Sequence, residues 1–339
     1  MTTDQVLENV PPPGILWEVD VELASKVQIV RAALELEVIP AVAAGHRDVD
    51  GIARATGCSI EGMRVLLDGL CVVGLLAWSD GSYELTPTSR MYLVPESPGY
   101  YGELVLADLK AADRFTENVR TGRIEPDYTS ADAGDLWAAY ARAELARWAD
   151  SVAPYRSRWS GLGVSATSMP GLRVLDVGCG PAIASLVLAL DDPSAAVTCV
   201  DRQPVLDVAA RTAEIMDVTS QARFVAGDIG TLRDLKGPYD VVFFGNVFHF
   251  LDPTEIDVAL RETRRLLAPD GRIVLNEPLR SLGDFEDPYP YLAAAWLFNV
   301  SPRGGIYTFE EHARMLVDAG FAPPRRLEGA PWLQAEVGP

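Results

Sequence analysis

A short stretch with two glycines has the residue types of a ligand-binding turn. It spans residues 173–181 and has the sequence Arg-Val-Leu-Asp-Val-Gly-Cys-Gly-Pro. The apolar residues around Asp176 predict a buried strand, and Gly178 and Gly180 would let a ligand approach the backbone closely. A dinucleotide-binding motif would have a third glycine at position 183, where this chain has isoleucine. Because Asp176 would repel a pyrophosphate, the turn favours a nucleotide-like ligand that carries positive charge.

Polar residues at the ends of the next predicted strands extend this candidate site. Asp201 could accept hydrogen bonds from two ribose hydroxyls, and Arg202 follows it as a further ligand contact. Asp228 could accept from an adenine amine while Ile229 packs on the ring, and Asn246 follows the fourth strand. The carboxyl ends of parallel strands meet at one edge of a sheet, which is where such sheets bind ligands. Asp and Asn also cap helices at these positions, so each residue taken alone leaves that alternative open.

A histidine and a glutamate at the same edge could perform acid–base chemistry. His249 follows the fourth strand, and a neutral imidazole there could accept a proton near neutral pH. Glu277 ends the fifth strand and could bind the far ring nitrogen, which would fix the tautomer of His249. The alternatives are a histidine that only packs in an aromatic loop and a glutamate that is solvated. The other two histidines, His46 and His312, are predicted to be solvated.

The elements that must position these residues are those of an α/β sheet. From residue 172 onward the pattern alternates between strand and helix, which predicts a Rossmann-like doubly wound parallel sheet. The predicted strands are 173–176, 197–200, 223–225, 240–244 and 272–276, with a last one near 332–337.

The residues before this sheet predict a mainly helical winged-helix domain. Three helices with apolar residues at helical spacing precede a hairpin with a Ser-Asp-Gly-Ser turn, and Ser59 is expected to cap the third helix. That helix carries one base, Arg64, against two acids, which disfavours contact with DNA phosphates. We therefore expect a dimerisation domain over residues 1–95, a helical linker and substrate lid over 96–170, and a catalytic domain over 171–339.

Composition narrows the class of protein. The 339 residues are 48% hydrophobic and 23% charged, which is typical of a globular chain. A formal net charge of −19 disfavours nucleic acid as a partner. No apolar stretch is long enough to cross a membrane, and the acidic N-terminus does not resemble a signal peptide. The four cysteines lack metal-ligand spacing, so we expect a cytoplasmic protein with reduced cysteines and no bound metal.

Together these motifs resemble the O-methyltransferases shared by plant phenolic metabolism and actinomycete natural-product biosynthesis. The Asp-x-Gly-x-Gly turn itself resembles the S-adenosylmethionine site of class I methyltransferases. The resemblance covers nearly the whole chain, and its segments are 29–44, 66–76 and 85–88 in the first domain and 175–180, 201, 227–228, 267–272, 304–308 and 319–321 in the second.

This resemblance implies S-adenosylmethionine as cofactor, a homodimer, and an N-terminal domain used for dimerisation. It also implies that His249 is the general base and Glu277 its support. Two positions depart from the family pattern. Phe250 stands where an aspartate often follows the histidine, and Ile306 stands where plant members have a second supporting glutamate.

Aromatic residues suggest the acceptor. Trp296, Phe298, Tyr291 and Phe115 are the candidate walls of a pocket for a flat, largely apolar molecule. The predicted function is methylation of a hydroxyl on a small aromatic or polyketide-like natural product. The alternatives are C- or N-methyl transfer, a non-methylating relative that performs cyclisation, elimination or hydroxylation, and a winged-helix regulator.

Overall fold

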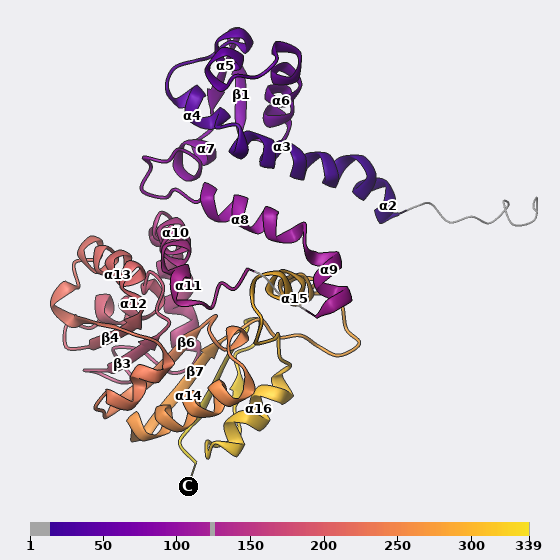
Figure 1. Cartoon of the computed structure of the whole chain (residues 1–339). Coiled ribbons are helices and arrows are strands. Elements are labelled where there is room, and N and C mark those ends of the chain that lie inside the picture. Colours follow the sequence, from indigo (N-terminus) through magenta and orange to yellow (C-terminus); the bar gives the residue numbers. More distant parts are fainter. Residues whose placement is uncertain (1–13, 123–125, 339) are drawn as a thin grey trace, which may run out of the picture. The chain divides into compact units, whose positions relative to one another are not determined.

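The chain folds as two units, one that ends at Leu109 and one that begins at Lys110 (Figure 1). The computed structural model describes residues 14–122 and 126–338. Helix α8 (Gly102–Ala112) crosses the boundary between the two units.

The first unit is a set of short helices followed by a two-stranded hairpin. Its elements are α2 (Ile15–Trp17), the π-helical turn η1 (Glu18–Leu23), α3 (Ala24–Glu35), α4 (Val38–Ala43), α5 (Val49–Thr56), α6 (Ile60–Val72), β1 (Leu76–Ser79), β2 (Ser82–Leu85) and α7 (Pro87–Tyr92). The Ser59 side chain accepts a hydrogen bond from the amide of Gly62, so the predicted cap of the third winged-helix helix, α6, is confirmed.

The second unit opens with helices. These are α9 (Phe115–Thr121), η2 (Ala131–Ala133), α10 (Gly134–Leu145) and α11 (Trp148–Gly161). Short breaks separate α8 from α9 and α10 from α11. Helical periodicity continues across such breaks, so the pattern alone does not locate them.

A seven-stranded, mostly parallel sheet follows, in the order β5-β4-β3-β6-β7-β9-β8. Its strands are β3 (Arg173–Val177), β4 (Ala196–Asp201), β5 (Ala222–Ala226), β6 (Tyr239–Gly245), β7 (Leu267–Asn276), β8 (Arg325–Arg326) and β9 (Trp332–Glu336). Strands β8 and β9 are antiparallel to their neighbours. The predicted α/β class is confirmed, while β8, with two residues, has no sequence pattern that could have predicted it.

Helices cover both faces of this sheet, and strand alternation sends side chains to each. The helical elements are α12 (Ile183–Asp191), α13 (Gln203–Ile215), η3 (Thr219–Gln221), η4 (Ile229–Asp234), η5 (Phe248–Phe250), α14 (Pro253–Leu266), α15 (Tyr289–Val300) and α16 (Phe309–Asp318). In β3, Val174 packs with the cluster that includes α12 and α13, whereas Leu175 and Val177 pack with the cluster that includes α14 and α16. Asp176, two residues after Val174, faces the same side of the sheet and points toward α12. It is a polar side chain surrounded by the apolar residues of that cluster.

Leu186 of α12 tests how far this packing stabilises the second unit. Its side chain is fully buried in the cluster that contains Val174. Leu186→Ala should lower the free energy of unfolding by about 2–5 kcal/mol, because it removes buried methyl groups and leaves a cavity. Urea unfolding measures the change. Leu282→Ala is the matched control, since Leu282 is 81% exposed and its loss should change stability by less than about 0.5 kcal/mol.

Candidate active site

The glycine turn after β3 is held against the end of β4. Gly178 and Gly180 both have positive φ, 66° and 54°. The amide of Gly178 donates to the carbonyl of Val200, and a Cβ at Gly178 would lie 2.6 Å from Cγ2 of Val247. Glycine is therefore required at position 178 for two reasons, backbone conformation and close packing.

Asp176 is buried beneath this turn with one carboxylate oxygen left without a partner. Ser185 of α12 donates to Oδ2, whereas Oδ1 is buried and has no hydrogen bond among the described residues. Burial raises the pKa of Asp176 to about 7, with Ser185 acting to lower it and the charge of Asp201 to raise it. An unsatisfied carboxylate oxygen beside an open backbone turn suits an ammonium group or a similar cationic donor.

Asp201 joins the end of β4 to the glycine turn. Its Oδ2 accepts from the amide of Gly180 at 2.9 Å, and its Oδ1 accepts from the amide of Arg202 at 2.7 Å. Burial raises its pKa, and these two amides oppose that rise. The Arg202 side chain extends the connection, because its Nη2 donates to the carbonyl of Thr129 at 2.7 Å.

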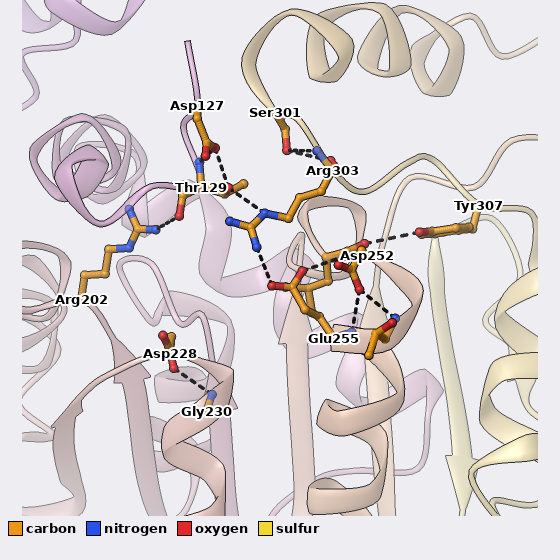
Figure 2. Close-up of polar contacts among 12 residues, drawn as sticks. Asp127, Thr129, Arg202, Asp228, Gly230, Asp252, Glu255, Ser301, Arg303 and Tyr307 are labelled. Atoms are coloured by element: carbon orange, nitrogen blue, oxygen red, sulfur yellow. Dashed lines mark hydrogen bonds and ion pairs between the residues drawn. The ribbon is translucent and has the colours of Figure 1, made fainter. Parts of the chain in front are cut away.

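Asp228 and Asn246 have structural roles at this edge. Asp228 caps η4, with Oδ1 accepting from the amide of Gly230 at 2.8 Å, as Figure 2 shows. Ile229 packs against the cluster below the sheet edge. Asn246 is exposed, has a φ of 59°, and its amide donates to the carbonyl of Asn276 at the end of β7. Asp228 therefore caps a helix, as the alternative interpretation proposed. The cap uses Oδ1, and Oδ2 takes no part in the bond to Gly230.

His249 and Glu277 form a buried pair. The Nδ1 atom of His249 lies 2.7 Å from Oε2 of Glu277, and the two side chains are 10% and 1% exposed. The other carboxylate oxygen, Oε1, accepts from the amides of Val247 and Phe248 at 2.7 and 2.8 Å. Glu277 therefore fixes the loop that carries His249 and also the orientation of its ring.

The charge state of this pair follows from its surroundings. Burial alone would raise the pKa of Glu277, but the His249 ring, His312 and the Phe248 amide outweigh burial and lower it. An ionised Glu277 can only accept hydrogen bonds, so Nδ1 of His249 must carry the proton and donate. The Nε2 atom is then the basic nitrogen that remains for a substrate.

The prediction that His312 is solvated is wrong. Its side chain on α16 is 1% exposed and packs against Phe248 and Tyr307. Burial lowers its pKa, although Glu277 and Glu311 oppose that shift. An imidazole can lie on either face of an amphipathic helix such as α16, and here its ring lies in the core. His46 is exposed, as expected.

A two-glycine loop holds the backbone of His249. The amide of Gly305 donates to the His249 carbonyl at 3.0 Å. A Cβ at Gly304, which has a φ of 84°, would lie 2.0 Å from the same oxygen. Ile306, the residue after this pair, is 5% exposed and contributes no polar group to the base.

Aromatic rings lie beside His249. Phe250 packs on His249 with ring centroids 4.4 Å apart, and it contacts both Trp296 at 6.0 Å and Trp137 at 5.0 Å. Trp137 of α10 was not among the predicted site residues, because nothing in the sequence signals that α10 approaches this loop.

The remaining predicted wall residues divide into two groups. Phe115 of α9 and Phe298 of α15 meet edge to face at 6.4 Å. On the same two helices, the buried side chains of Asn118 and Asn299 share a hydrogen bond that no sequence pattern predicts. Tyr291 instead packs on Phe285, and its hydroxyl donates to backbone carbonyls of its own loop, so the structure does not bring it to the other aromatics.

Two negative observations apply to the part of the chain that the structure describes. It contains no group of three or more His, Cys, Asp or Glu side chains arranged to hold a metal ion. It also contains no helix long and apolar enough to cross a membrane.

The fold and this edge of the sheet define a class of protein. A glycine turn, carboxylates at successive strand ends and a buried His–Glu pair beside them make up the ligand-binding edge of a doubly wound α/β enzyme. Two family models match the chain, the methyltransferase domain over residues 174–271 and the O-methyltransferase dimerisation domain over residues 22–95.

Individual relatives agree with these matches. The 3-hydroxy-5-methyl-1-naphthoate 3-O-methyltransferase of Streptomyces sahachiroi is 26% identical over 90% of this chain and 88% of its own. The acetylserotonin O-methyltransferase of Mus musculus is 28% identical over 87% of this chain and 80% of its own. A structure of human N-acetylserotonin methyltransferase in complex with S-adenosylmethionine shares the fold, with a TM-score of 0.72, 19% identity and complete coverage of both chains. The chain belongs to the class I S-adenosylmethionine-dependent O-methyltransferase family.

The pKa of Asp176 predicts how stability changes with pH when no ligand is bound. The folded protein keeps a proton on Asp176 up to about pH 7, whereas the unfolded chain releases it near 3.8. Because the folded state then binds more protons than the unfolded state, its contribution to the free energy of unfolding should fall as pH rises through that window and level off above it. Asp176→Asn should make this slope shallower in urea unfolding at a series of pH values, while the raised pKa of Asp201 continues to contribute in the same direction.

Asp240→Asn is the matched control for this experiment. Burial acts to raise the pKa of Asp240, but hydrogen bonds from Arg173 outweigh it and lower the pKa. Its titration in the folded state therefore lies below the window, and this variant should retain the wild-type slope between pH 5 and 8. An Asp176→Asn slope as steep as that of wild type would show that Asp176 does not titrate in this window.

Proposed function

We propose that this chain is an O-methyltransferase in which His249 removes the proton from an acceptor hydroxyl. The observation that supports this proposal most strongly is the bond between Nδ1 of His249 and Glu277, because it leaves Nε2 as the basic ring atom. Proton transfer by a positioned imidazole typically accelerates a reaction by about 10²–10⁴-fold.

The reaction needs little covalent chemistry from the protein. S-adenosylmethionine, when bound, supplies a methyl group already activated by a sulfonium centre. Nε2 of His249 would accept the hydroxyl proton as the acceptor oxygen bonds to the methyl carbon. The bond from that carbon to sulfur would break, and its electron pair would stay on the sulfur of the departing S-adenosylhomocysteine. Glu277 stabilises the imidazolium that results, and its two backbone hydrogen bonds keep it in place as the charge develops. The aromatic rings of Phe250 and Trp296 limit the access of water to the base.

The cofactor-binding residues follow from the edge of the sheet. We propose that Asp176 receives the cationic amino group through its unpartnered oxygen and that Gly178 and Gly180 allow close approach of the ligand. Asp201 would bind the ribose, and the further contacts would come from Arg202, Asp228, Ile229 and Asn246. Asp201 already binds the Gly180 amide, so it can share its oxygens between the turn and a ribose hydroxyl.

The acceptor we propose is a small aromatic or polyketide-like natural product. The relatives named above act on a naphthoate and on acetylserotonin, both of which are aromatic. In this chain, Trp296 of α15 contacts Phe250 beside His249, and Phe298 of the same helix meets Phe115 of α9 edge to face. Tyr291 is not among the proposed wall residues, because its ring packs on Phe285 and its hydroxyl donates to the carbonyl of Asp284.

We also propose that the chain functions as a homodimer. The first unit matches the dimerisation domain of the family and leaves large apolar side chains exposed on α2, η1 and α3. These include Trp17, at 75% exposure, and Val21 and Val27. Exposed apolar side chains in such number on one short segment are typical of a protein interface.

One observation favours a second reaction class. Phe250 packs an apolar ring on His249 where the family often has an aspartate, and the buried Ile306 is apolar where plant members have a glutamate. Among the described residues, the carboxylate bonded to the His249 ring is that of Glu277. A reaction with less demand for a strong base, such as C- or N-methyl transfer, or a non-methylating reaction would also fit this environment.

Variants of the His–Glu pair test the assignment of the base. His249→Ala should lower turnover by about 10²-fold or more, with little change in affinity for S-adenosylhomocysteine in calorimetry. Glu277→Gln should be as severe, because the amide would donate to Nδ1 and force the proton onto Nε2. His46→Ala is the control and should match wild type. Full turnover in His249→Ala would remove this histidine from the mechanism.

The acceptor and reaction type can be tested together. Incubation of the protein with S-adenosylmethionine that carries a labelled methyl group and a set of hydroxylated naphthoates, indoles and polyketides should transfer label to one of them. Mass spectrometry should show a gain of one methyl group, located on oxygen. A product without that gain, or with methyl on carbon or nitrogen, would favour the second reaction class.

A further inference from the structure

A short segment before α10 is fastened to the sheet edge by several hydrogen bonds. We call residues 127–130 the strap. The amide of Tyr128 donates to the carbonyl of Val300 at 2.7 Å, and the Tyr128 carbonyl accepts from the Trp137 indole at 2.8 Å. The Thr129 carbonyl accepts from Arg202, the neighbour of Asp201. The strap is thus linked to the cofactor side of the site.

The Thr129 side chain orders the strap internally and offers one more bond. Its hydroxyl donates to Oδ1 of Asp127, which also accepts from the Thr129 amide at 2.8 Å. The same hydroxyl oxygen accepts from Nε of Arg303 at 3.1 Å. Figure 2 shows the Arg303 side chain reaching from the loop after α15 to Thr129.

Arg303 uses a second nitrogen to reach the base-bearing side of the site. Its Nη1 lies 2.7 Å from Oε1 of Glu255, in the first turn of α14. The other oxygen of Glu255 accepts from the amide of Asp252 at 2.9 Å, which completes the capping box of α14 (Figure 2). That helix begins a few residues after His249, so Arg303 connects the strap to the end of the base loop.

The backbone of Arg303 adds a third connection. Ser301 donates to its carbonyl at 2.7 Å, and the next two residues, Gly304 and Gly305, lie directly against the His249 carbonyl. The position of Arg303 and the position of His249 are therefore fixed by the same loop. No contact joins the Arg303 side chain to His249 itself.

We propose that Arg303 is a positioning residue that clamps the strap, and with it the cofactor edge, to the loop that carries His249. The inference rests on the function proposed above. A planar guanidinium is suited to this task, because Nε and Nη1 reach two acceptors on different elements in a fixed geometry. A lysine ammonium in its place could satisfy one acceptor strongly and the other weakly.

Because the Arg303–Glu255 ion pair is partly exposed, its effect on catalysis can be distinguished from its effect on folding stability. The side chains of Arg303 and Glu255 are 38% and 27% exposed, and partly exposed ion pairs contribute little to folding. The rate of catalysis is more sensitive than stability to the alignment of the reacting groups, because a displacement of about 1 Å can lower the rate about 10²-fold. Loss of the clamp should therefore appear in catalysis and in strap mobility, with little change in melting temperature.

Arg303→Gln tests the proposal in the full-length protein. We expect kcat to fall about tenfold or more, because the base and the cofactor edge lose their alignment. Hydrogen exchange in the peptide that contains Tyr128 and Thr129 should become faster, while the melting temperature stays near wild type. Arg303→Lys should restore part of kcat, and Thr129→Val combined with Arg303→Gln should be no worse than Arg303→Gln alone.

Arg261→Gln is the matched control. It removes an exposed ion pair with Asp257 on the same helix and should leave exchange and kcat unchanged. The clamp is contradicted if Arg303→Gln matches this control in both readouts, or if it lowers kcat only in proportion to a lost melting temperature. If the wild-type protein transfers no methyl group, the proposed function fails. The clamp can still be tested then, by comparing hydrogen exchange of the strap and affinity for S-adenosylhomocysteine between Arg303→Gln and wild type.

Discussion

The carboxylate of Glu277 is the point on which the active-site edge depends. It is almost fully buried, yet it is ionised, because two backbone amides and the His249 ring share its charge. A buried charge with fewer partners would be costly, so the loop after β6 has to keep one conformation to provide them. The hydrogen bonds that stabilise the buried charge of Glu277 therefore also fix the position and orientation of His249.

The order of strand ends could be predicted, because each strand combines a buried apolar run with a polar residue at its end. Asp176, Asp201, His249 and Glu277 all lie at one edge, as the sequence indicated. The contacts of Trp137 and Arg303 could not be predicted, because they join segments far apart in the sequence. Hydrophobic periodicity reports on one helix or strand at a time and does not show which segments meet. His312 was misjudged because a neutral imidazole fits either face of an amphipathic helix.

Several polar side chains at the site share one feature, which is that their hydrogen-bond partners are backbone atoms. Most side chains that shape the site are bound to backbone atoms, as with Glu277 on two amides, Asp201 on two amides, and Arg202 on a carbonyl. Backbone partners are supplied by the fold whatever residues occupy neighbouring positions. The aromatic lining near Phe250 can therefore differ among relatives with different acceptors, while His249 and the strand-end carboxylates stay in place.

The unpartnered oxygen of Asp176 has a consequence for the energetics of binding. With a pKa of about 7, this carboxyl is partly protonated near neutral pH before a ligand arrives. A cationic group that pairs with the carboxylate will displace that proton into solution. Under the role proposed for Asp176, cofactor capture is coupled to proton release, and the observed binding enthalpy will vary with the ionisation enthalpy of the buffer that takes up the proton.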